Sequence, residues 1–500
     1  MPARNNLNTL VMTFGAAIAL SACNGGADEV ASPGIGAFPP APVAVPPPPP
    51  PPPPGPPPTS GPPADCPSGF ANVGTIVDRT GATLRSCLLP QAVIGGLVVP
   101  AREGTIYAIS GRTDVGQDQG GDINAPLTNR ERGILTIEPG VRLYGSGGLD
   151  FIVVNRGSQL NVQGTAQAPV IMTSRQSIEG NTNVDSIGQW GGLVVLGRAP
   201  IANCPGATTP GTPGCEAQVE GTNAFYGGNG SADNSGSIRY LRIQHSGFQI
   251  LPNNELNGIT LAGVGNNTTF EFVQVHNSSD DGIEWFGGTV NGRYLVLTGN
   301  DDDSLDTDVG FKGAIQFALV VQRANGGDRM NEFSGLGLEA ANPKIANVTY
   351  VGRAGGGAGI AMNTGTNSRY FNTVVTRPAG GSGSGASCLD VDNGVQESPP
   401  GTTTGTFDSV FFSCPNAFDD DASGAAAALF NAGTNNTANG TSTLTATFIN
   451  GANESAVTAF ANLPSVSSFF AQVSYIGAVR DANDTWWQGW TCGLTAATPC

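Results

Sequence analysis

The stretch from Asn277 to Gly310 reads NSSDDGIEWFGGTVNGRYLVLTGNDDDSLDTDVG and contains the same phrase twice. Asp280 to Glu284 (DDGIE) recurs as Asp302 to Asp306 (DDSLD), an offset of 22 residues at every position. A period of this length marks a repeat architecture, in which each unit buries its apolar face only against its neighbours. Equivalent residues of stacked units lie above one another, so this repeat would also stack acids upon acids. The stretch therefore predicts the fold and supplies the main candidate site.

A six-residue pattern typical of a short strand recurs along the chain on both sides of this stretch. It consists of a glycine, an apolar residue, any residue, two apolar residues and a second glycine. Copies, some of them looser, begin at Gly192, Gly258, Gly282, Ser304, Gly359 and Cys388. A second strand follows each copy, and three of these contain Phe272, Tyr294 and Phe317, which lie 22 and 23 residues apart. Short strands with glycine or proline corners predict an all-β parallel β-helix, with coils stacked about 4.8 Å apart. A sandwich of hairpins is the alternative, but hairpins do not produce this in-phase repeat.

The coil pattern predicts which side chains face inward. An aliphatic column is expected to comprise Ile259, Ile283, Leu305 and Leu389, with the residue after each pointing outward. Beyond about residue 450 the pattern changes, and residues 454–463 suggest a short helix. The tryptophan-rich residues 484–490 suggest a cap over the end of the solenoid, or alternatively a surface on which sugar rings stack.

Composition limits the partners. Only 12% of residues are charged, glycine accounts for 72 of 500, and 39 acids against 22 bases give a net charge of −17. Such a charge repels nucleic acid and anionic lipid, so we expect no nucleic-acid partner. A cation or a neutral glycan is the more natural ligand.

The N-terminus predicts export and a lipid anchor. Residues 1–22 resemble a signal peptide, and its last three residues together with Cys23, Leu20-Ser21-Ala22-Cys23, resemble the lipobox of bacterial lipoproteins. That resemblance implies that Cys23 becomes a diacylated N-terminal residue and attaches the chain to a membrane. Asn24 replaces the aspartate associated with inner-membrane retention, which favours the outer membrane. An ordinary signal peptide with a chance cysteine is the alternative.

The remaining chain divides by composition. Residues 23–65 form a proline-rich linker, with nine consecutive prolines from Pro46 to Pro54, which we expect to be disordered and extended. Residues 66–130 are expected to hold an N-terminal cap and the first strands, 131–450 the β-helix, and 451–500 a C-terminal cap.

Eight cysteines follow Cys23, an even number that suits an oxidising compartment. They fall in sequential pairs that predict four local disulfides: Cys66 with Cys87, Cys204 with Cys215, Cys388 with Cys414, and Cys492 with Cys500. A metal-binding role is weaker, because the chain has no CxxC motif and only two histidines.

Several phrases together resemble a group of bacterial exported β-helix proteins. The matching phrases include LTIEPG (135–140), QGTAQAPVIMTS (163–174), QWGGLVVLGRAPI (189–201), SADNSGSIRYLRI (231–243) and DDGIEWFGGTVN (280–291). The resemblance spans roughly residues 85–492 and implies a right-handed, pectate-lyase-like β-helix at the cell surface or in the secreted space. It implies no catalytic residues.

The stacked acids are the candidate metal ligands: Asp280, Asp281, Glu284, Asp302, Asp303, Asp306 and Asp308. Two like charges about 4.8 Å apart repel by roughly 1 kcal/mol in water and by more inside a protein. A bound cation, nearby bases such as Arg293 and Lys312, or raised pKa values must compensate this repulsion. Calcium suits such a site because it takes six to eight oxygen ligands. The alternative is that the acids cap tight corners as solvated Asx-turns.

A catalytic carboxylate pair is a further alternative, with Asp281, Glu284, Asp303 and Asp306 as candidates. A lyase would also need a base, for which Lys312 and Arg323 are available in sequence. His276 lies four residues before Asp280, but a lone histidine is more often a surface residue.

Four aromatic residues occupy equivalent positions in successive coils: Tyr240, Phe272, Tyr294 and Phe317. Exposed, they would form a platform on which a glycan stacks. The preferred alternative is that residues 198–236 or the C-terminal segment cover them.

These observations support three function hypotheses for an outer-membrane lipoprotein of unknown oligomeric state. The first is non-enzymatic binding or adhesion towards carbohydrate or another envelope component, with structural calcium. The second is a polysaccharide lyase or hydrolase that uses the stacked acids. The third is an accessory lipoprotein of an outer-membrane transporter.

Overall fold

A computed structural model describes residues 61–251, 254–335, 337–363, 366–378, 387–391, 405–420, 425–494, 499 and 500. These residues belong to one compact unit, residues 51–500. The expected signal peptide (1–22), the lipidation site Cys23 and nearly all of the proline-rich linker (23–65) lie outside the described residues. No helix in the described ranges has the length and apolar character needed to cross a membrane.

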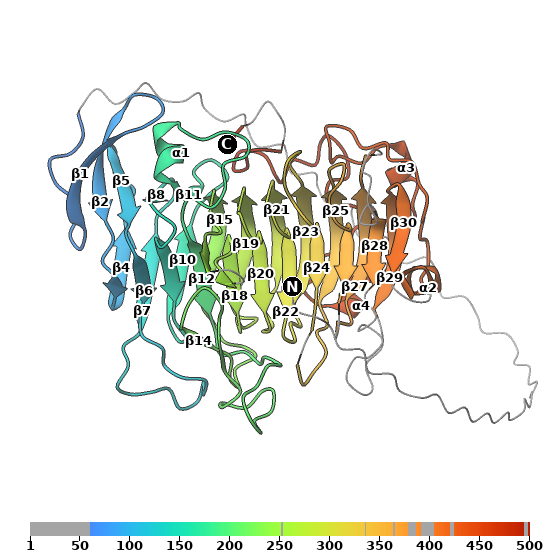
Figure 1. The fold of residues 1–500 in the computed structure, drawn as a ribbon, viewed down its shortest axis with the longest axis horizontal. Coiled ribbons are helices and arrows are strands. Elements are labelled where there is room, and N and C mark those ends of the chain that lie inside the picture. The colour runs from blue at the N-terminus through green and yellow to red at the C-terminus, as the bar shows by residue number, and fades with distance from the viewer. Residues whose placement is uncertain are drawn as a thin grey trace, which may run out of the picture. The chain divides into compact units, whose positions relative to one another are not determined.

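Two large sheets, built almost entirely of parallel strands, make up the fold (Figure 1). The 15-stranded sheet, here called sheet A, contains β1 (Ala71–Val77), β2 (Thr83–Leu88), β4 (Gly95–Val99), β5 (Thr105–Ile109), β7 (Gly133–Ile137), β8 (Arg142–Gly145), β10 (Gln159–Gln163), β11 (Val170–Ser174), β15 (Gly236–Gln244), β19 (Thr269–His276), β21 (Gly292–Thr298), β23 (Ala314–Val321), β25 (Lys344–Val351), β27 (Arg369–Thr376) and β29 (Thr406–Ser413).

The 11-stranded sheet, here called sheet B, contains β3 (Ala92–Val93), β6 (Arg112–Val115), β9 (Phe151–Val154), β12 (Gly192–Leu196), β18 (Ile259–Ala262), β20 (Ile283–Phe286), β22 (Leu305–Asp308), β24 (Asn331–Phe333), β26 (Ile360–Met362), β28 (Ser387–Val391) and β30 (Asn416–Asp420). Two small hairpins are β13 (Ala217–Gln218) with β14 (Phe225–Tyr226), and β16 (Gln249–Leu251) with β17 (Asn254–Glu255). The helices are α1 (Arg175–Glu179), α2 (Ala425–Ala432), α3 (Ala452–Ser455) and α4 (Leu463–Val466).

The chain alternates between the two sheets, so each coil contributes a strand to both, as a parallel β-helix requires. Strands β20 and β22 pair in parallel with Ile283 opposite Leu305 and Glu284 opposite Asp306, which confirms the 22-residue repeat. Parallel pairing begins already at β2 with β5, so residues 66–130 do contain coil strands. Among the described strands of the two large sheets, β1 alone departs from this pattern, because it pairs antiparallel with β2 at the edge of sheet A.

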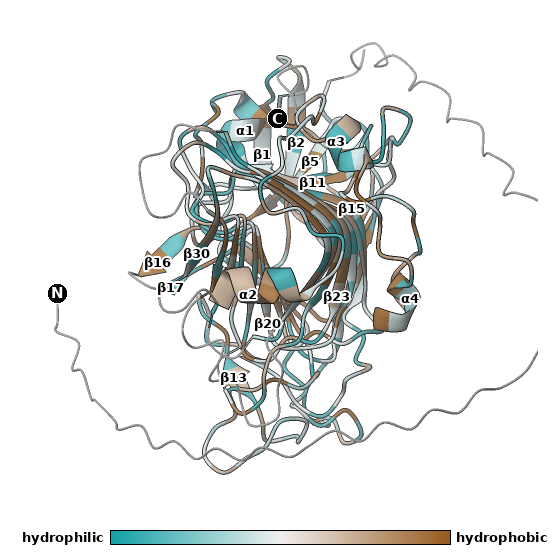
Figure 2. Cartoon of the chain, turned by 90° about the vertical axis from the view of Figure 1, so that its right-hand side faces the viewer, coloured by the Kyte–Doolittle hydropathy of each residue, from teal (hydrophilic) through white to brown (hydrophobic). Residues whose placement is uncertain are grey.

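The interior between the sheets is apolar (Figure 2) and contains the expected column. Ile259, Ile283, Leu305 and Leu389 are all fully buried there. The sequence did not predict that Asn331 would continue the column opposite Leu305. Its side-chain oxygen accepts a hydrogen bond from the Tyr350 hydroxyl at 2.7 Å, which offsets part of the cost of burying the amide, whereas Nδ2 has no hydrogen-bond partner among the described residues.

Sheet A bends at one residue per coil. The equivalent residues Tyr240, Phe272, Tyr294 and Phe317 all have positive φ, between 51° and 59°. The next coils place Asn347, Asn372 and Ser409 in the same left-handed conformation. Non-glycine residues rarely adopt it, so its recurrence marks a bend built into every coil.

The segment expected to cap the solenoid lies elsewhere. Helix α2 closes the end instead, where Phe430 packs against Phe407, Phe412 and Phe418 of the last coil. Residues 441–494, 499 and 500, here called the C-terminal strap, run back along the outer face of sheet A. This placement corrects the prediction of a cap at 451–500, because outward apolar side chains of sheet A, such as Val296 and Leu319, needed cover. The expected helix at 454–463 is also wrong, since only Ala452–Ser455 and Leu463–Val466 are helical.

All four expected disulfides are present, so the pairing of sequence neighbours is confirmed. Cys388–Cys414 links β28 to the residue that follows β29. Cys204–Cys215 closes a loop in the segment between β12 and β15.

The first disulfide joins Cys66, which precedes β1, to Cys87 on β2. The sequence predicted its pairing but not its environment, because Cys87 is fully buried in the apolar interior rather than placed in a separate cap. The physical reason is register: Cys87 lies opposite the buried Tyr107 of β5 in the first parallel strand pair. Cys87 is therefore a core residue of the first coil as well as a covalent link to the chain before it.

We expect Leu305→Ala to lower the free energy of unfolding by about 2–5 kcal/mol, because Leu305 is fully buried and truncation leaves a cavity. Urea unfolding followed by circular dichroism measures the change. The matched control is Leu149→Ala, at a leucine that is 56% exposed, where the change should stay within about 0.5 kcal/mol. Equal losses in the two variants would contradict the inward placement of Leu305.

Candidate functional site

Strand pairing on the outer face of sheet B aligns one acid per coil. Glu284 lies opposite Thr260 on one side and Asp306 on the other, and Asp306 lies opposite Glu332. These side chains point away from the apolar interior because strand residues alternate between the two faces. The expected position of Glu284 beneath Asp306 is thus confirmed. Glu332 extends the column by one more coil.

The corners before these strands carry a second group of acids. The Asp303 backbone N–H donates to Asp281 Oδ1 at 3.0 Å, so the two copies of the aspartate pair lie one above the other. Asp303 Oδ1 in turn accepts from the Arg329 backbone N–H at 2.6 Å. Oxygens of Asp280, Asp281 and Asp302 lie within 4.8 Å of one another, as do those of Asp302, Asp303 and Asp328. We call the column and these corner residues together the acidic stack.

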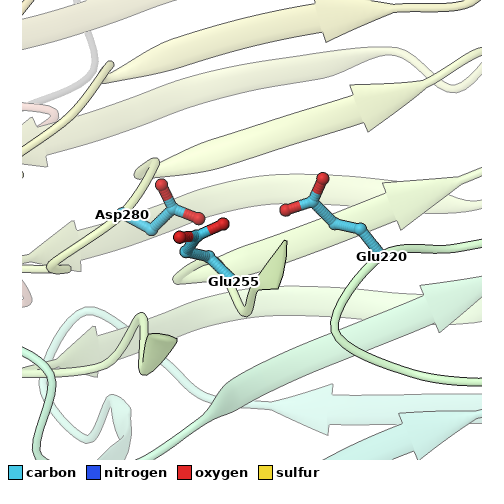
Figure 3. Close-up of side chains that lie close together, drawn as sticks. All are labelled: Glu220, Glu255 and Asp280. Atoms are coloured by element: carbon cyan, nitrogen blue, oxygen red, sulfur yellow. The ribbon is translucent and has the colours of Figure 1, made fainter. Parts of the chain in front are cut away.

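Two excursions from the coils cover part of the stack. Residues 198–236 pack over sheet B through an apolar cluster that includes Ile201, Tyr226 and Phe286. This segment delivers Glu220, and the β16–β17 hairpin delivers Glu255, to the side of Asp280. Figure 3 shows the three carboxylates pointing toward one another from three separate segments. One oxygen from each lies within 4.8 Å of the others.

Because of this cover, the central acids are not solvated. Asp281 is 7% exposed, Glu284 6% and Asp303 3%. The alternative of fully solvated Asx-turns is therefore wrong for these three residues. The excursions that bury them do not belong to the repeat, so the repeat alone could not predict the burial.

Burial raises the pKa of every carboxyl group in the centre of the stack, and repulsion between neighbours adds to the effect. The pKa values of Asp281, Glu284, Asp303 and Asp306 lie well above their ordinary values for this reason. At the edges, burial raises the pKa to about 8 for Asp280, about 7 for Glu220 and about 6 for Asp308. The stack is thus poised to hold either protons or a cation.

The two bases expected to compensate the repulsion between the stacked carboxylates form ion pairs with other acids. Arg293 pairs with Glu271 at 2.6 Å, and Lys312 pairs with Glu339. Arg329 is the base that does reach the acids, through ion pairs with Asp328 at 3.0 Å and Glu332 at 2.7 Å. One guanidinium against this many carboxyl groups leaves a large excess of potential negative charge.

Two carboxylate oxygens in the stack have no partner. Asp306 Oδ1 and Asp308 Oδ1 are shielded from solvent, and neither has a hydrogen-bond partner among the described residues. Oxygens of Asp281, Glu284 and Asp306 lie within 4.8 Å of one another. Glu284 also accepts a hydrogen bond from Asn257 Nδ2 at 2.5 Å. Convergent, unpartnered oxygens of this kind can bind a hard cation.

The arrangement suits catalysis less well. The spacing of Glu284 and Asp306 is compatible with a carboxylate pair that acts on a glycosidic bond. A polysaccharide chain, however, could not straddle residues as buried as Asp281 and Glu284 while the cover is in place. The expected lyase bases are also engaged elsewhere, since Arg323 pairs with Asp301 and Asp185, and Lys312 with Glu339.

The four aromatic residues do form a ladder, but on sheet A. Rings of Tyr240, Phe272 and Tyr294 stack at 4.3 and 4.4 Å, and Phe317 follows at 5.1 Å. The C-terminal strap covers them: Trp490 lies 5.9 Å from the Tyr240 ring, and Trp486 lies 5.3 Å from the Tyr294 ring. These tryptophans take the face on which a sugar would have stacked.

Sequence reasoning missed Glu220, Glu255, Asp328, Arg329 and Glu332. Glu332 follows the in-phase Asn331 by one position and could have been found by allowing a longer coil there. Asp328 and Arg329 share this longer offset, since they follow Asp302 and Asp303 by the same 26 positions as Asn331 follows Leu305. Glu220 and Glu255 come from segments outside the repeat, and no periodic signal marks them.

Without divalent cations, we expect stability to fall as the pH rises. A carboxyl group whose pKa is raised by folding keeps its proton in the folded state at a pH where the unfolded chain has released it, so deprotonation favours unfolding. For Asp280 this window runs from its ordinary value of 3.8 to about 8. Thermal unfolding in a chelator across this range should show a falling midpoint, and Asp280→Asn should flatten the slope. The exposed control Glu103→Gln should retain it, and a midpoint that rises with pH would contradict the expectation.

Comparison with known proteins agrees with this architecture. Residues 110–491 match the family described as a pectate-lyase like beta helix domain. A solved structure, "Crystal structure of pectate lyase Pel9A", aligns with 65% of this chain and 71% of its own at 11% identity, with a TM-score of 0.27. No curated protein sequence matches the chain. Because the family match spans most of the sequence, the chain belongs to the pectate-lyase like beta helix domain family.

Proposed function

We propose that this chain is a non-enzymatic binding protein of the cell envelope, directed at carbohydrate or another envelope component, in which the acidic stack holds calcium. The observation that carries the calcium part is the shielded Asp306 Oδ1, which has no hydrogen-bond partner among the described residues and converges with oxygens of Asp281 and Glu284. A second such oxygen, Asp308 Oδ1, lies two residues further along β22. A buried acceptor without a donor costs free energy, and a cation would recover it.

Among the common cations, calcium fits the type of ligand atom that the acidic stack offers. Every candidate ligand is a carboxylate oxygen, and calcium accepts six to eight such ligands in flexible geometry. Magnesium demands a tighter octahedron and keeps much of its water, while zinc and copper prefer histidine and cysteine. Asp281, Glu284 and Asp306 would form the centre of the site, with Asp308 beside them and Asp280, Asp302 and Asp303 at the corners.

The second candidate function is a polysaccharide lyase or hydrolase. The close spacing of the carboxylates favours it, since oxygens of Glu284 and Asp306 lie within 4.8 Å. If the wild type turns over an acidic glycan and Asp306→Asn does not, the lyase or hydrolase function is favoured over non-enzymatic binding. Binding across a glycan panel without turnover would support the first.

Calcium should stabilise the wild-type protein by roughly 2.7 kcal/mol when its concentration reaches about a hundred times the dissociation constant. Calorimetric titration and thermal unfolding at about pH 8 measure binding and stabilisation. Asp306→Asn should weaken binding at least about tenfold, because it removes a negative charge from the centre of the site. The matched control is Glu103→Gln, which removes one exposed carboxylate from the turn before β5.

Two results would count against calcium. One is an unchanged unfolding midpoint at millimolar calcium. The other is equal affinity in the wild type, Asp306→Asn and Glu103→Gln, which would mean that calcium binds outside the stack.

We further propose that Cys23 carries a lipid that anchors the folded unit to the outer membrane through the proline-rich linker. Its support is the apolar segment that ends in Leu20-Ser21-Ala22-Cys23. Cys23→Ser should move the protein from the membrane to the soluble fraction of the bacterial envelope. Asn24→Asp, the matched control, should keep it membrane-bound but in the inner membrane. Membrane association that survives Cys23→Ser would contradict the anchor.

A further inference from the structure

A cavity of about 530 Å³ lies beside the ends of β15, β19, β21 and β23 in sheet A, whereas the acidic stack lies on sheet B. Val184, from the loop after α1, forms part of one wall, and Gly493 of the C-terminal strap forms part of another. Its lining is mainly apolar with a few polar groups. Both its size and this mixture are typical of small-molecule sites.

The two histidines of the chain meet in this cavity. His245 and His276 come from neighbouring strand ends, and their rings lie 5.6 Å apart, nearly perpendicular. His276 Nδ1 lies 2.9 Å from the Thr298 hydroxyl. Burial lowers the pKa of both imidazoles, so both are neutral.

His245 presents a bare acceptor. Its side chain is only 2% exposed, and Nδ1 lies 2.7 Å from the carbonyl oxygen of Ser186. A carbonyl can only accept, so Nδ1 carries the proton and Nε2 carries a lone pair. Nε2 is shielded from solvent and has no hydrogen-bond partner in the described part of the chain. A group that donates a hydrogen bond into the cavity would offset this cost.

The charges around the cavity select an uncharged donor. The positive charge of Arg242 helps to lower the pKa of His276 and disfavours a divalent cation at the two histidines. An anion finds no free partner in Arg323, because Asp301 and Asp185 already pair with this guanidinium, Asp185 through Nε at 3.6 Å.

We propose that this cavity binds an uncharged saccharide of one or two rings, with a hydroxyl group donating to His245 Nε2. A sugar ring offers both hydroxyl groups and apolar C–H faces, which match the unpartnered Nε2 and the side chains of Val184 and Val321. The inference gives a location to the carbohydrate binding proposed above and rests on that proposal for its ligand class. It does not depend on calcium.

Imidazole nitrogen NMR of ¹⁵N-histidine-labelled protein provides a direct test, because the chain has only two histidines. The probes are glucose, galactose, N-acetylglucosamine, maltose, cellobiose and lactose, with zinc chloride as a separate probe. Binding of a saccharide should shift the Nε2 resonance of His245 toward that of a hydrogen-bonded acceptor. Calorimetry with the same probes should give a saturable isotherm.

Two variants separate the site from the fold. His245→Asn removes the Nε2 acceptor but keeps a residue type suited to the backbone, since Asn277 has the same positive φ one coil later. Val184→Trp, at a valine that is 77% exposed, should fill the entrance without disturbing the interior. Both should weaken saccharide binding at least tenfold. Val98→Trp, at a valine on β4 that is 50% exposed, is the matched control and should bind as the wild type does.

The outcomes are distinct from those for calcium. Asp306→Asn should bind the saccharide normally, so loss of calcium binding alone leaves this inference intact. The inference is overturned if none of the saccharides binds the wild type, or if Val184→Trp binds as tightly as Val98→Trp. It is also overturned if zinc, and no saccharide, shifts the His245 resonance in the wild type but not in His245→Asn.

Discussion

Parallel stacking in strict register is the constraint on which the rest of this structure depends. Backbone hydrogen bonds place each residue of β22 directly opposite the residue 22 positions earlier in β20. On the inner face that register stacks Ile283 on Leu305 and builds the apolar core. On the outer face it stacks Glu284 on Asp306 and concentrates charge. One geometric rule therefore produces both the stability of the fold and the repulsion that its site must relieve.

The outer faces of both sheets are largely covered, and this cover determines which groups can meet a ligand. Residues 198–236 and the β16–β17 hairpin bury the centre of the acidic stack, while the C-terminal strap buries the aromatic ladder. The covering segments thus keep long polymers away from both the acidic stack and the aromatic ladder. The cover therefore favours the small ligands proposed above, calcium and a short saccharide, over long polymers.

The repeat made the fold predictable because it encodes register directly. The phrase at 280–284 and its copy at 302–306 specify the strand partners, and the sequential cysteine pairs follow from chain proximity. Glu220 and Glu255 were not predictable, since they reach the stack from segments without a period. The burial of Glu284 was not predictable for the same reason, because the segments that cover it lie outside the repeat. The function of residues 451–500 was misjudged because sequence alone does not say whether a closing segment turns across the end of a solenoid or back along its side.

The C-terminal strap changes how a solenoid of this kind comes apart. Gln274 exchanges two hydrogen bonds with the backbone of Cys492, Gln316 does the same with Ala471, and Arg79 donates to the Cys500 carbonyl. The strap is thus bound both to the turn after β1, through Arg79, and to strands β19 and β23 in the middle of the sequence. An open solenoid frays one unit at a time from its free ends. Here, peeling away a coil that the strap contacts also breaks these hydrogen bonds, so the strap couples the unfolding of the coils to which it is bound. Because the strap follows the coils in the sequence, it can dock only after the coils have been synthesised, and its docking would then join a loose stack of coils into one cooperative unit.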